Sequence, residues 1–149
     1  MDRAKYTTEN SDQLSVCSTF GGLQMAQNII FDSLIQVLNK YKQGQHKGVR
    51  WFLEELDAND YEGYLQKYPG ASTERSHFIA VCGFFELSGV LVSYGLIDQN
   101  LYFDIFNPTP FWNKAKPIVE GMRTKRPHIY ENFELLNNKR LSWTKKRNR

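Results

Sequence analysis

Between Phe78 and Ile97 the sequence is almost entirely apolar or small for 20 residues, and Glu86 is the only formal charge in that run. A run of this length matches the thickness of a bilayer, but a carboxylate near its middle would cost a few kcal/mol in hydrocarbon. The run also holds Ser88, Ser93 and three glycines. We therefore interpret it as the central helix of a soluble bundle, buried by its neighbours, with a membrane span as the alternative.

Local signals set the bounds of this helix and of its neighbours. Ser72 is a good amino-terminal cap, and Gly95 offers the left-handed residue that often follows a helix. Pro117 should kink or split the helix that Thr109 caps, near Lys114. Apolar periodicity and breakers predict the remaining helices at 23–41, 47–56, 59–68, 98–106 and 128–143. The sequence thus predicts an all-α, single-domain bundle of about six to seven helices around a central helix at about 72–94.

Charge is distributed unevenly along the chain. Residues 1–120 hold ten Lys/Arg and fourteen Asp/Glu, a net charge of −4, whereas residues 121–149 hold nine Lys/Arg and two Asp/Glu, a net charge of +7. Residues 1–18 are polar without sustained periodicity. We therefore divide the chain into a flexible leader (1–18), a helical domain (19–138) and a basic carboxyl-terminal arm (139–149).

Cysteine content and the amino terminus indicate a compartment. Cys17 and Cys82 are too few for a disulfide scaffold, and the first ten residues lack an apolar core that a secretion machinery would read. A reducing cytoplasmic location is therefore expected.

Three segments carry a likeness to known sequences: Phe84-Phe85-Glu86-x-x-Gly89, then Phe111-Trp112, then Tyr130-Glu131-Asn132-Phe133-Glu134. In these segments the chain resembles an all-helical domain family of bacteria and their phages that has no assigned activity. The resemblance covers roughly residues 72–136. It implies a small helical module in which these aromatics pin the last two helices onto the core. The resemblance also implies that some members are membrane-tethered, whereas we expect no anchoring segment and no membrane partner for this chain.

Glu86 is the most informative single residue, because a carboxylate in an apolar helix is paired, protonated or open to solvent. We interpret it as a structural buried acid bonded to Arg50, Arg75, an indole N–H or a tyrosine hydroxyl. A catalytic role is the alternative. Gly83 and Gly89 in the same helix each cost about 1 kcal/mol relative to alanine, so we expect another backbone to cross the helix at both.

An acidic cluster precedes the central helix. Its members are Glu54, Glu55, Asp57, Asp60 and Glu62. The segment from Asp57 partly mimics a calcium loop, but Glu62 stands at the glycine position and Tyr68 at that of the closing glutamate. We interpret the cluster as a solvated surface that contacts a basic protein partner, and no metal or cofactor is expected. His46, His77 and His128 are far apart, and phosphate loops and nucleophile elbows do not occur.

The basic arm is the candidate nucleic-acid surface. Six cations and one aromatic make it up: Lys139, Arg140, Trp143, Lys145, Lys146, Arg147 and Arg149. Lysine and arginine neutralise phosphates, and a tryptophan can stack on a base. A solubilising tail or a dock for an acidic protein are the alternatives, and no recognition-helix motif supports sequence-specific binding.

These features together favour a small regulatory module that binds another protein and lacks catalytic activity. A nucleic-acid-associated protein that uses the basic arm is the second hypothesis. An enzyme centred on Glu86 is the third. The sequence leaves the oligomeric state and the identity of the partner open.

Overall fold

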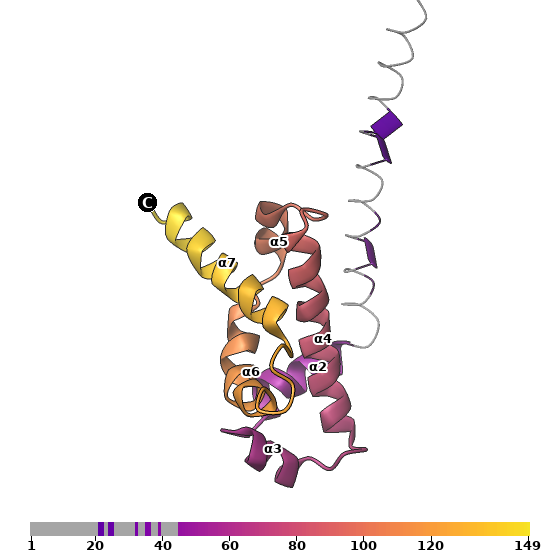
Figure 1. The fold of residues 1–149 in the computed structure, drawn as a ribbon, viewed down its shortest axis with the longest axis vertical. Helices are drawn as coiled ribbons and strands as arrows, with labels where there is room; N and C mark the ends of the chain where they lie inside the picture. The colour runs from indigo at the N-terminus through magenta and orange to yellow at the C-terminus, as the bar shows by residue number, and fades with distance from the viewer. Residues whose placement is uncertain (1–20, 23, 26–31, 33–34, 37–38, 40–44) are drawn as a thin grey trace, which may run out of the picture.

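The computed structural model describes residues 21–22, 24–25, 32, 35–36, 39 and 45–149. The predicted leader and most of the helix predicted at 23–41 lie outside these residues. Every regular element that the structure describes from residue 45 onward is helical, which confirms the all-α, single-domain bundle (Figure 1). The elements are α2 (Gln45–Arg50), the π-helix η1 (Trp51–Glu55), α3 (Tyr61–Lys67), α4 (Thr73–Ser93), α5 (Gln99–Ile105), α6 (Thr109–Met122) and α7 (Glu131–Arg147).

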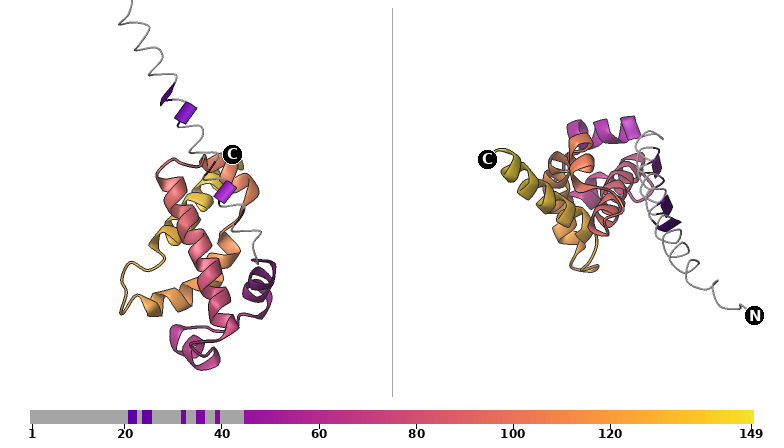
Figure 2. Two further views of the ribbon diagram at one scale, coloured as in Figure 1. Left: turned by 90° about the vertical axis from the view of Figure 1, so that its right-hand side faces the viewer. Right: turned by 90° about the horizontal axis from the view of Figure 1, so that it is seen from above.

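The central helix α4 has the predicted bounds. Ser72 accepts a hydrogen bond from the backbone N–H of Arg75 at 3.3 Å, and Gly95 has φ +71°. α7 crosses α4 and makes the most extensive helix–helix contact of the fold, and α2 packs on α4 as well (Figures 1 and 2). By length and composition alone α4 is apolar enough to cross a membrane, and 44% of that stretch is buried in the protein.

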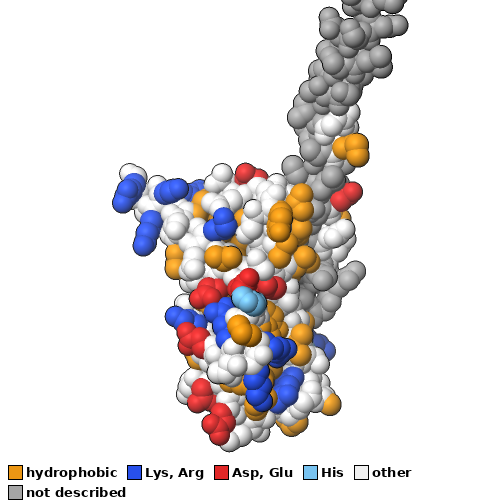
Figure 3. All heavy atoms as spheres, in the orientation of Figure 1, with side chains coloured by type: hydrophobic (Ala, Val, Ile, Leu, Met, Phe, Trp, Pro, Cys, Tyr) orange, Lys and Arg blue, Asp and Glu red, His pale blue; other side chains and the backbone are white. Residues whose placement is uncertain are grey.

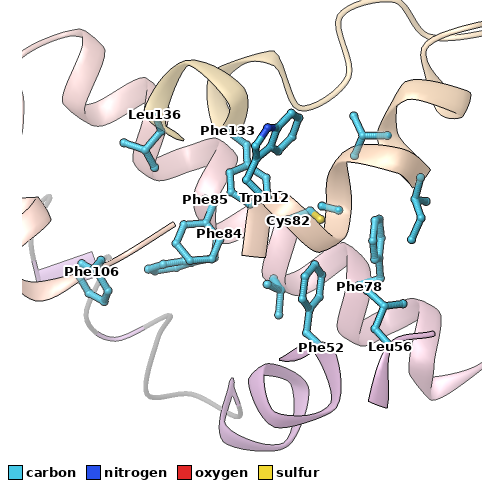
Figure 4. Packing of buried hydrophobic residues seen from close by; sticks show 14 of the residues in the cluster. Phe52, Leu56, Phe78, Cys82, Phe84, Phe85, Phe106, Trp112, Phe133 and Leu136 are labelled. Carbon is cyan, nitrogen blue, oxygen red and sulfur yellow. The ribbon is translucent and has the colours of Figure 1, made fainter. Parts of the chain in front are cut away.

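The core consists largely of aromatic rings, which each bury a large apolar area. Figure 4 shows Phe85, Trp112 and Phe133 close together, from α4, α6 and α7, while Phe78 of α4 lies nearer to Phe52. Phe52 of η1 stacks on Phe78 with a centroid distance of 5.5 Å. Side chains from elements far apart in the sequence thus share one core.

Two details of α6 differ from the predictions. Asn107 rather than Thr109 provides the side-chain oxygen at its start, since Asn107 Oδ1 accepts a bond from the Thr109 N–H at 3.2 Å. Pro117 lies inside α6 without splitting it. Ala115, Ile118 and Val119 around the proline are fully buried, so packing holds this helix together where a backbone bond is lost.

The predicted helix at 47–56 consists of two elements, because the Leu56 N–H bonds to the Trp51 carbonyl at 2.8 Å and so forms a π turn after α2. This wider turn directs Trp51, Phe52 and Leu56 inward and leaves Glu54 and Glu55 exposed. The last helix begins at Glu131 instead of His128 and extends to Arg147 instead of Trp143. Most of the predicted arm is therefore the second half of α7.

Candidate functional site

Glu86 joins α4 to the first turn of α7. Its Oε1 accepts a hydrogen bond from Asn132 Nδ2 at 2.8 Å, and its Oε2 accepts one from the backbone N–H of Phe133 at 2.9 Å. The first N–H groups of a helix have no partner within it, and they form the positive end of its dipole. Glu86 therefore acts as an amino-terminal cap supplied by a different helix.

This arrangement corrects the predicted surroundings of Glu86. The side chain is half-buried rather than sealed, and its partners come from α7. Arg75 instead donates to the Tyr68 carbonyl at 2.6 Å, and exposed Arg50 pairs with Glu54 at 2.9 Å. Tyr130 at the start of α7 has φ 55° and ψ 30° and makes no side-chain cap bond, so the free N–H groups of α7 are left for Glu86.

Gly89 lets the two helices approach each other. A Cβ atom built on Gly89 would lie 2.2 Å from the Asn132 carbonyl oxygen, which is far below any van der Waals contact. The crossing predicted at Gly89 is thus present. The crossing predicted at Gly83 was wrong, because no atom of the described residues lies within 4 Å of a Cβ built there.

Aromatic rings complete the junction between α4, α6 and α7. Phe85 stacks on Phe133 with a centroid distance of 4.9 Å and an interplanar angle of 13°. Trp112 meets Phe133 edge-on with a centroid distance of 5.0 Å (Figure 4). The Phe111 ring contacts Phe85 with a centroid distance of 4.8 Å. The three sequence segments that carry the family resemblance therefore meet at one place, as the resemblance implied for the aromatics.

Arg123 fastens the segment that leads into α7. Its guanidinium pairs with Glu134 at 2.6 Å, donates to the Ile129 carbonyl at 3.2 Å and lies 5.8 Å from the centre of the Trp112 ring. Sequence reasoning did not single out Arg123 or Asn132. The motif around Asn132 was visible, but its partner Glu86 is 46 residues away.

One thiol and two phenols in or beside the core are held in their neutral forms. Burial raises the pKa of the Cys82 thiol, and the nearby Glu86 carboxylate raises it further. Burial likewise raises the pKa of Tyr130, and it raises the pKa of Tyr64 to about 12. Since a thiolate or phenolate is disfavoured here, these groups are suited to packing rather than to nucleophilic chemistry.

The five predicted acidic residues lie in or beside η1 and α3, and all are exposed. Three of them have internal partners: Glu54 pairs with Arg50, Asp57 with Lys67 at 2.6 Å, and Asp60 accepts from the Gly63 N–H at 2.7 Å. Among the described residues, Glu55 and Glu62 have no ion-pair partner. We call Glu54, Glu55, Asp57, Asp60 and Glu62 the acidic end.

The seven predicted residues of the basic arm divide into two groups in the structure. Trp143 packs on Phe103 of α5 with a centroid distance of 5.6 Å, and its Nε1 donates to Asn100 Oδ1 at 2.8 Å. Arg140 bonds to the Phe103 carbonyl, Arg147 pairs with Asp104, and both guanidinium groups lie over the Trp143 ring. The other four have no acidic partner among the described residues: Lys139, Lys145, Lys146 and Arg149.

We call these four cations the basic end. Lys139 lies in the middle of α7, Lys145 and Lys146 lie in its last turn, which extends beyond the other helices, and Arg149 follows the helix (Figures 1 and 2). Figure 3 shows the blue side chains on this projection and red ones at the lower left of the molecule. The basic end and these acidic side chains thus lie at opposite ends of this view, while charges of both signs mix between them. Nothing in the sequence singled out Asn100, the residue that ties Trp143 to α5.

Two grooves on the described surface are open to solvent. One, of about 370 Å³, lies between η1 and the start of α4 and is lined by Trp51, Glu55 and His77 among others. The other, of about 340 Å³, lies beside the end of α7 and includes Asn107, Arg140 and Lys145. Glu86 lines neither groove. Within the part of the chain that the structure describes, no three His, Cys, Asp or Glu side chains gather as a metal ion would require.

Comparison with known proteins gives one match. A family described as "Domain of unknown function (DUF4760)" matches residues 24–140, which include the whole junction between α4, α6 and α7. No curated protein and no solved structure matches the chain.

Proposed function

The chain belongs to the DUF4760 family of domains of unknown function, and we propose that this member is a regulatory interaction module without catalytic activity that binds another protein. The proposal rests on the hydrogen bonds that Glu86 accepts. Both of its carboxylate oxygens accept hydrogen bonds from α7, so the most conspicuous acid of the chain acts as a structural cap. The residues that carry the family resemblance hold helices together, which leaves the outer surface for binding.

The acidic end is the surface that we assign to the partner. Its side chains are exposed, and Glu55 and Glu62 form no ion pair among the described residues, although the charge of Arg50 acts on Glu55. A patch of one charge speeds the encounter with a surface of opposite charge and disfavours wrong partners. The expected partner is therefore a protein with a basic patch. We also propose a cytoplasmic location, which the free thiol of buried Cys82 supports.

Charge reversal tests this proposal. The double variant Glu55→Lys/Glu62→Lys is compared with Glu120→Lys/Glu131→Lys, which makes the same change of charge on α6 and α7. The tagged proteins are incubated with a lysate of the source organism, and bound proteins are quantified by mass spectrometry. We expect one partner to be lost from the first variant and kept by the second. Equal retention of every bound protein by both variants would contradict the proposal.

A second candidate function is nucleic-acid association through the basic end. The four unpaired cations on a projecting helix favour it, whereas the Trp143 indole, packed on Phe103 and bonded to Asn100, is not free to stack on a base. Deletion of residues 139–149 would remove those packing contacts too. Lys145→Glu/Lys146→Glu is therefore the better test, with Lys125→Glu/Arg126→Glu as the control of equal charge.

The two candidates differ in how binding responds to salt. Four phosphate contacts would give a slope of roughly −3 to −4 for log affinity against log salt concentration. If the basic end binds nucleic acid, the Lys145 and Lys146 variant should lose about two contacts and reduce that slope by nearly half. A wild-type protein without measurable affinity at low salt would eliminate this second function.

A further inference from the structure

The groove beside the end of α7 has positive charge on both of its sides and no carboxylate among the described residues that line it. Its volume is about 340 Å³, and it lies between the start of α6 and the last turns of α7. Arg140 and Lys145 are the charged residues of its lining. At 3.6 residues per turn they lie at opposite edges of the α7 surface in the groove, with Leu141, Thr144 and Asn148 between them. The charge of the groove therefore suits an anion.

Arg140 is held in position for such an anion. Its guanidinium lies 4.8 Å from the centre of the Trp143 ring and donates a hydrogen bond to the Phe103 carbonyl. A guanidinium has further N–H donors, and no described carboxylate pairs with Arg140. The helix dipoles contribute little, because the positive end of α6 and the negative end of α7 meet at this groove. A fixed guanidinium binds phosphate well, since its N–H groups match two phosphate oxygens.

The threonines of the groove offer acceptors rather than donors. Thr109 Oγ1 donates its proton to Asn137 Oδ1 at 2.8 Å, and Thr144 Oγ1 donates to the Arg140 carbonyl at 3.0 Å. Because a hydroxyl has a single proton, both oxygens have only lone pairs left for a ligand. Lone pairs repel an anion and accept hydrogen bonds from hydroxyl groups. A ligand that satisfies both parts of the groove therefore carries hydroxyl groups beside its phosphate.

Size and the lack of rings in the lining narrow the ligand further. At a liquid share of about 30 Å³ per molecule the groove holds roughly ten waters, which is more space than one phosphate group fills. No aromatic side chain of the described residues lines it, so a base would find no surface on which to stack. Exposed Leu141 gives an apolar contact for a carbon skeleton. These features fit a sugar phosphate better than a nucleotide.

We propose that this groove is a binding site for a small sugar phosphate. Arg140 and Lys145 bind the phosphate from its two sides. Thr109 and Thr144 accept hydrogen bonds from the sugar hydroxyls. The site lies apart from the acidic end, so either proposal can fail without the other. It also differs from the nucleic-acid hypothesis, in which Lys145 and Lys146 contribute alike.

NMR titration of the full chain with ribose 5-phosphate tests the site, with ribose and inorganic phosphate as controls at constant ionic strength. We expect the side-chain amide signals of Asn107 and Asn148 to shift, because both residues line the groove. Ribose 5-phosphate should bind at least about fivefold more tightly than inorganic phosphate, since only the ester adds hydrogen bonds from the sugar. Ribose alone should give no saturable shift, because it lacks the charge.

Two neighbouring lysines give a matched pair of variants. Lys145 lines the groove, whereas Lys146 lies about 100° further round α7, away from it. Lys145→Gln should raise the dissociation constant for ribose 5-phosphate at least about fivefold. Lys146→Gln makes the same change of charge and should raise it less than about twofold, because salt screens an exposed charge that makes no contact. Thr144→Val should weaken the binding of ribose 5-phosphate but not of inorganic phosphate.

Several outcomes would overturn the sugar-phosphate site. One is the lack of a saturable shift at both asparagines, and another is inorganic phosphate that binds as tightly as ribose 5-phosphate. Equal weakening by the two lysine variants would show that α7 attracts any anion through its net charge. A single-stranded RNA oligonucleotide that shifts the same asparagine signals, and that ribose 5-phosphate does not displace, would assign the groove to the second candidate function instead.

Discussion

The Asn132 carbonyl oxygen lies so close to Gly89 that a Cβ atom at position 89 would be 2.2 Å from it. α7 begins directly on the backbone of α4 at this point, and Glu86, one helical turn earlier, caps α7 from the same side. Glu86 thus binds the start of α7, and Gly89 leaves the space that the backbone of α7 occupies.

Two glycines of α4 should respond in opposite ways to alanine. Gly89→Ala forces two backbones apart and should lower the free energy of unfolding by about 3 kcal/mol or more. Gly83→Ala meets no described atom and should raise it by about 0.5–1 kcal/mol, since alanine favours helix. Urea unfolding of dilute protein measures both. Equal effects of the two substitutions would show that α7 does not contact α4 at Gly89.

Loss of the cap should destabilise the fold moderately. Glu86→Ala leaves two donors of α7 without their acceptor and should cost about 1–2 kcal/mol, as loss of a helix cap does. Glu86→Gln retains an acceptor oxygen and should cost less. Asn132→Asp, which sets a second carboxylate beside Glu86, should cost more than Asn132→Ala. Thermal and urea unfolding rank the four variants, and Glu120→Ala on the exposed side of α6 is the control.

The ion pair between Arg123 and Glu134 should stabilise the fold measurably, whereas the exposed pair between Lys116 and Glu120 on α6 should not. Arg123 and Glu134 side chains are 23% and 33% exposed, and their closest atoms are 2.6 Å apart. A double-mutant cycle with Arg123→Ala and Glu134→Ala should give a coupling of about 1–2 kcal/mol. Lys116 and Glu120, at 3.8 Å and largely exposed, should couple by less than about 0.5 kcal/mol. Similar couplings for the two pairs would show that Arg123 does not hold α7.

Alkaline pH should destabilise the fold through Tyr64. Burial raises the pKa of Tyr64 from 10.0 to about 12. Between these values the unfolded chain releases a phenolic proton that the folded chain retains, so stability falls as pH rises through this window. Tyr64→Phe should make the fall less steep, whereas Tyr94→Phe, at an exposed position, should not change it. Unfolding measured in urea at a series of pH values gives the slopes.

Much of the fold was predictable because its signals are local. Ser72 and Gly95 delimit α4 through their own backbone preferences, and a 3.6-residue period needs no knowledge of distant contacts. The end of α7 was predicted too early, at Trp143 instead of Arg147, because the contacts that stabilise its last turns are with a distant element. The basic composition of this segment is typical of a tail. Only the position of α5 gives partners to Arg140, Trp143 and Arg147.

The candidate site was predictable in its residues but not in its contacts. Glu86 was singled out because a carboxylate in an apolar helix needs a partner, yet arginines seemed the better candidates from charge alone. The partner is instead a backbone N–H of a helix 47 residues later, which any sequence can provide. Gly83 and Gly89 are alike in sequence, and only the path of α7 distinguishes them.

Because α7 follows α4 by about 40 residues, the surface of α4 that α7 covers stays exposed until α7 has been synthesised. Chains emerge amino terminus first, and α4 must wait for a contact 46 residues downstream. During that interval the Phe85 ring lacks its stacking partner Phe133. A nascent chain stalled before residue 131 is thus the form in which this protein most needs a chaperone.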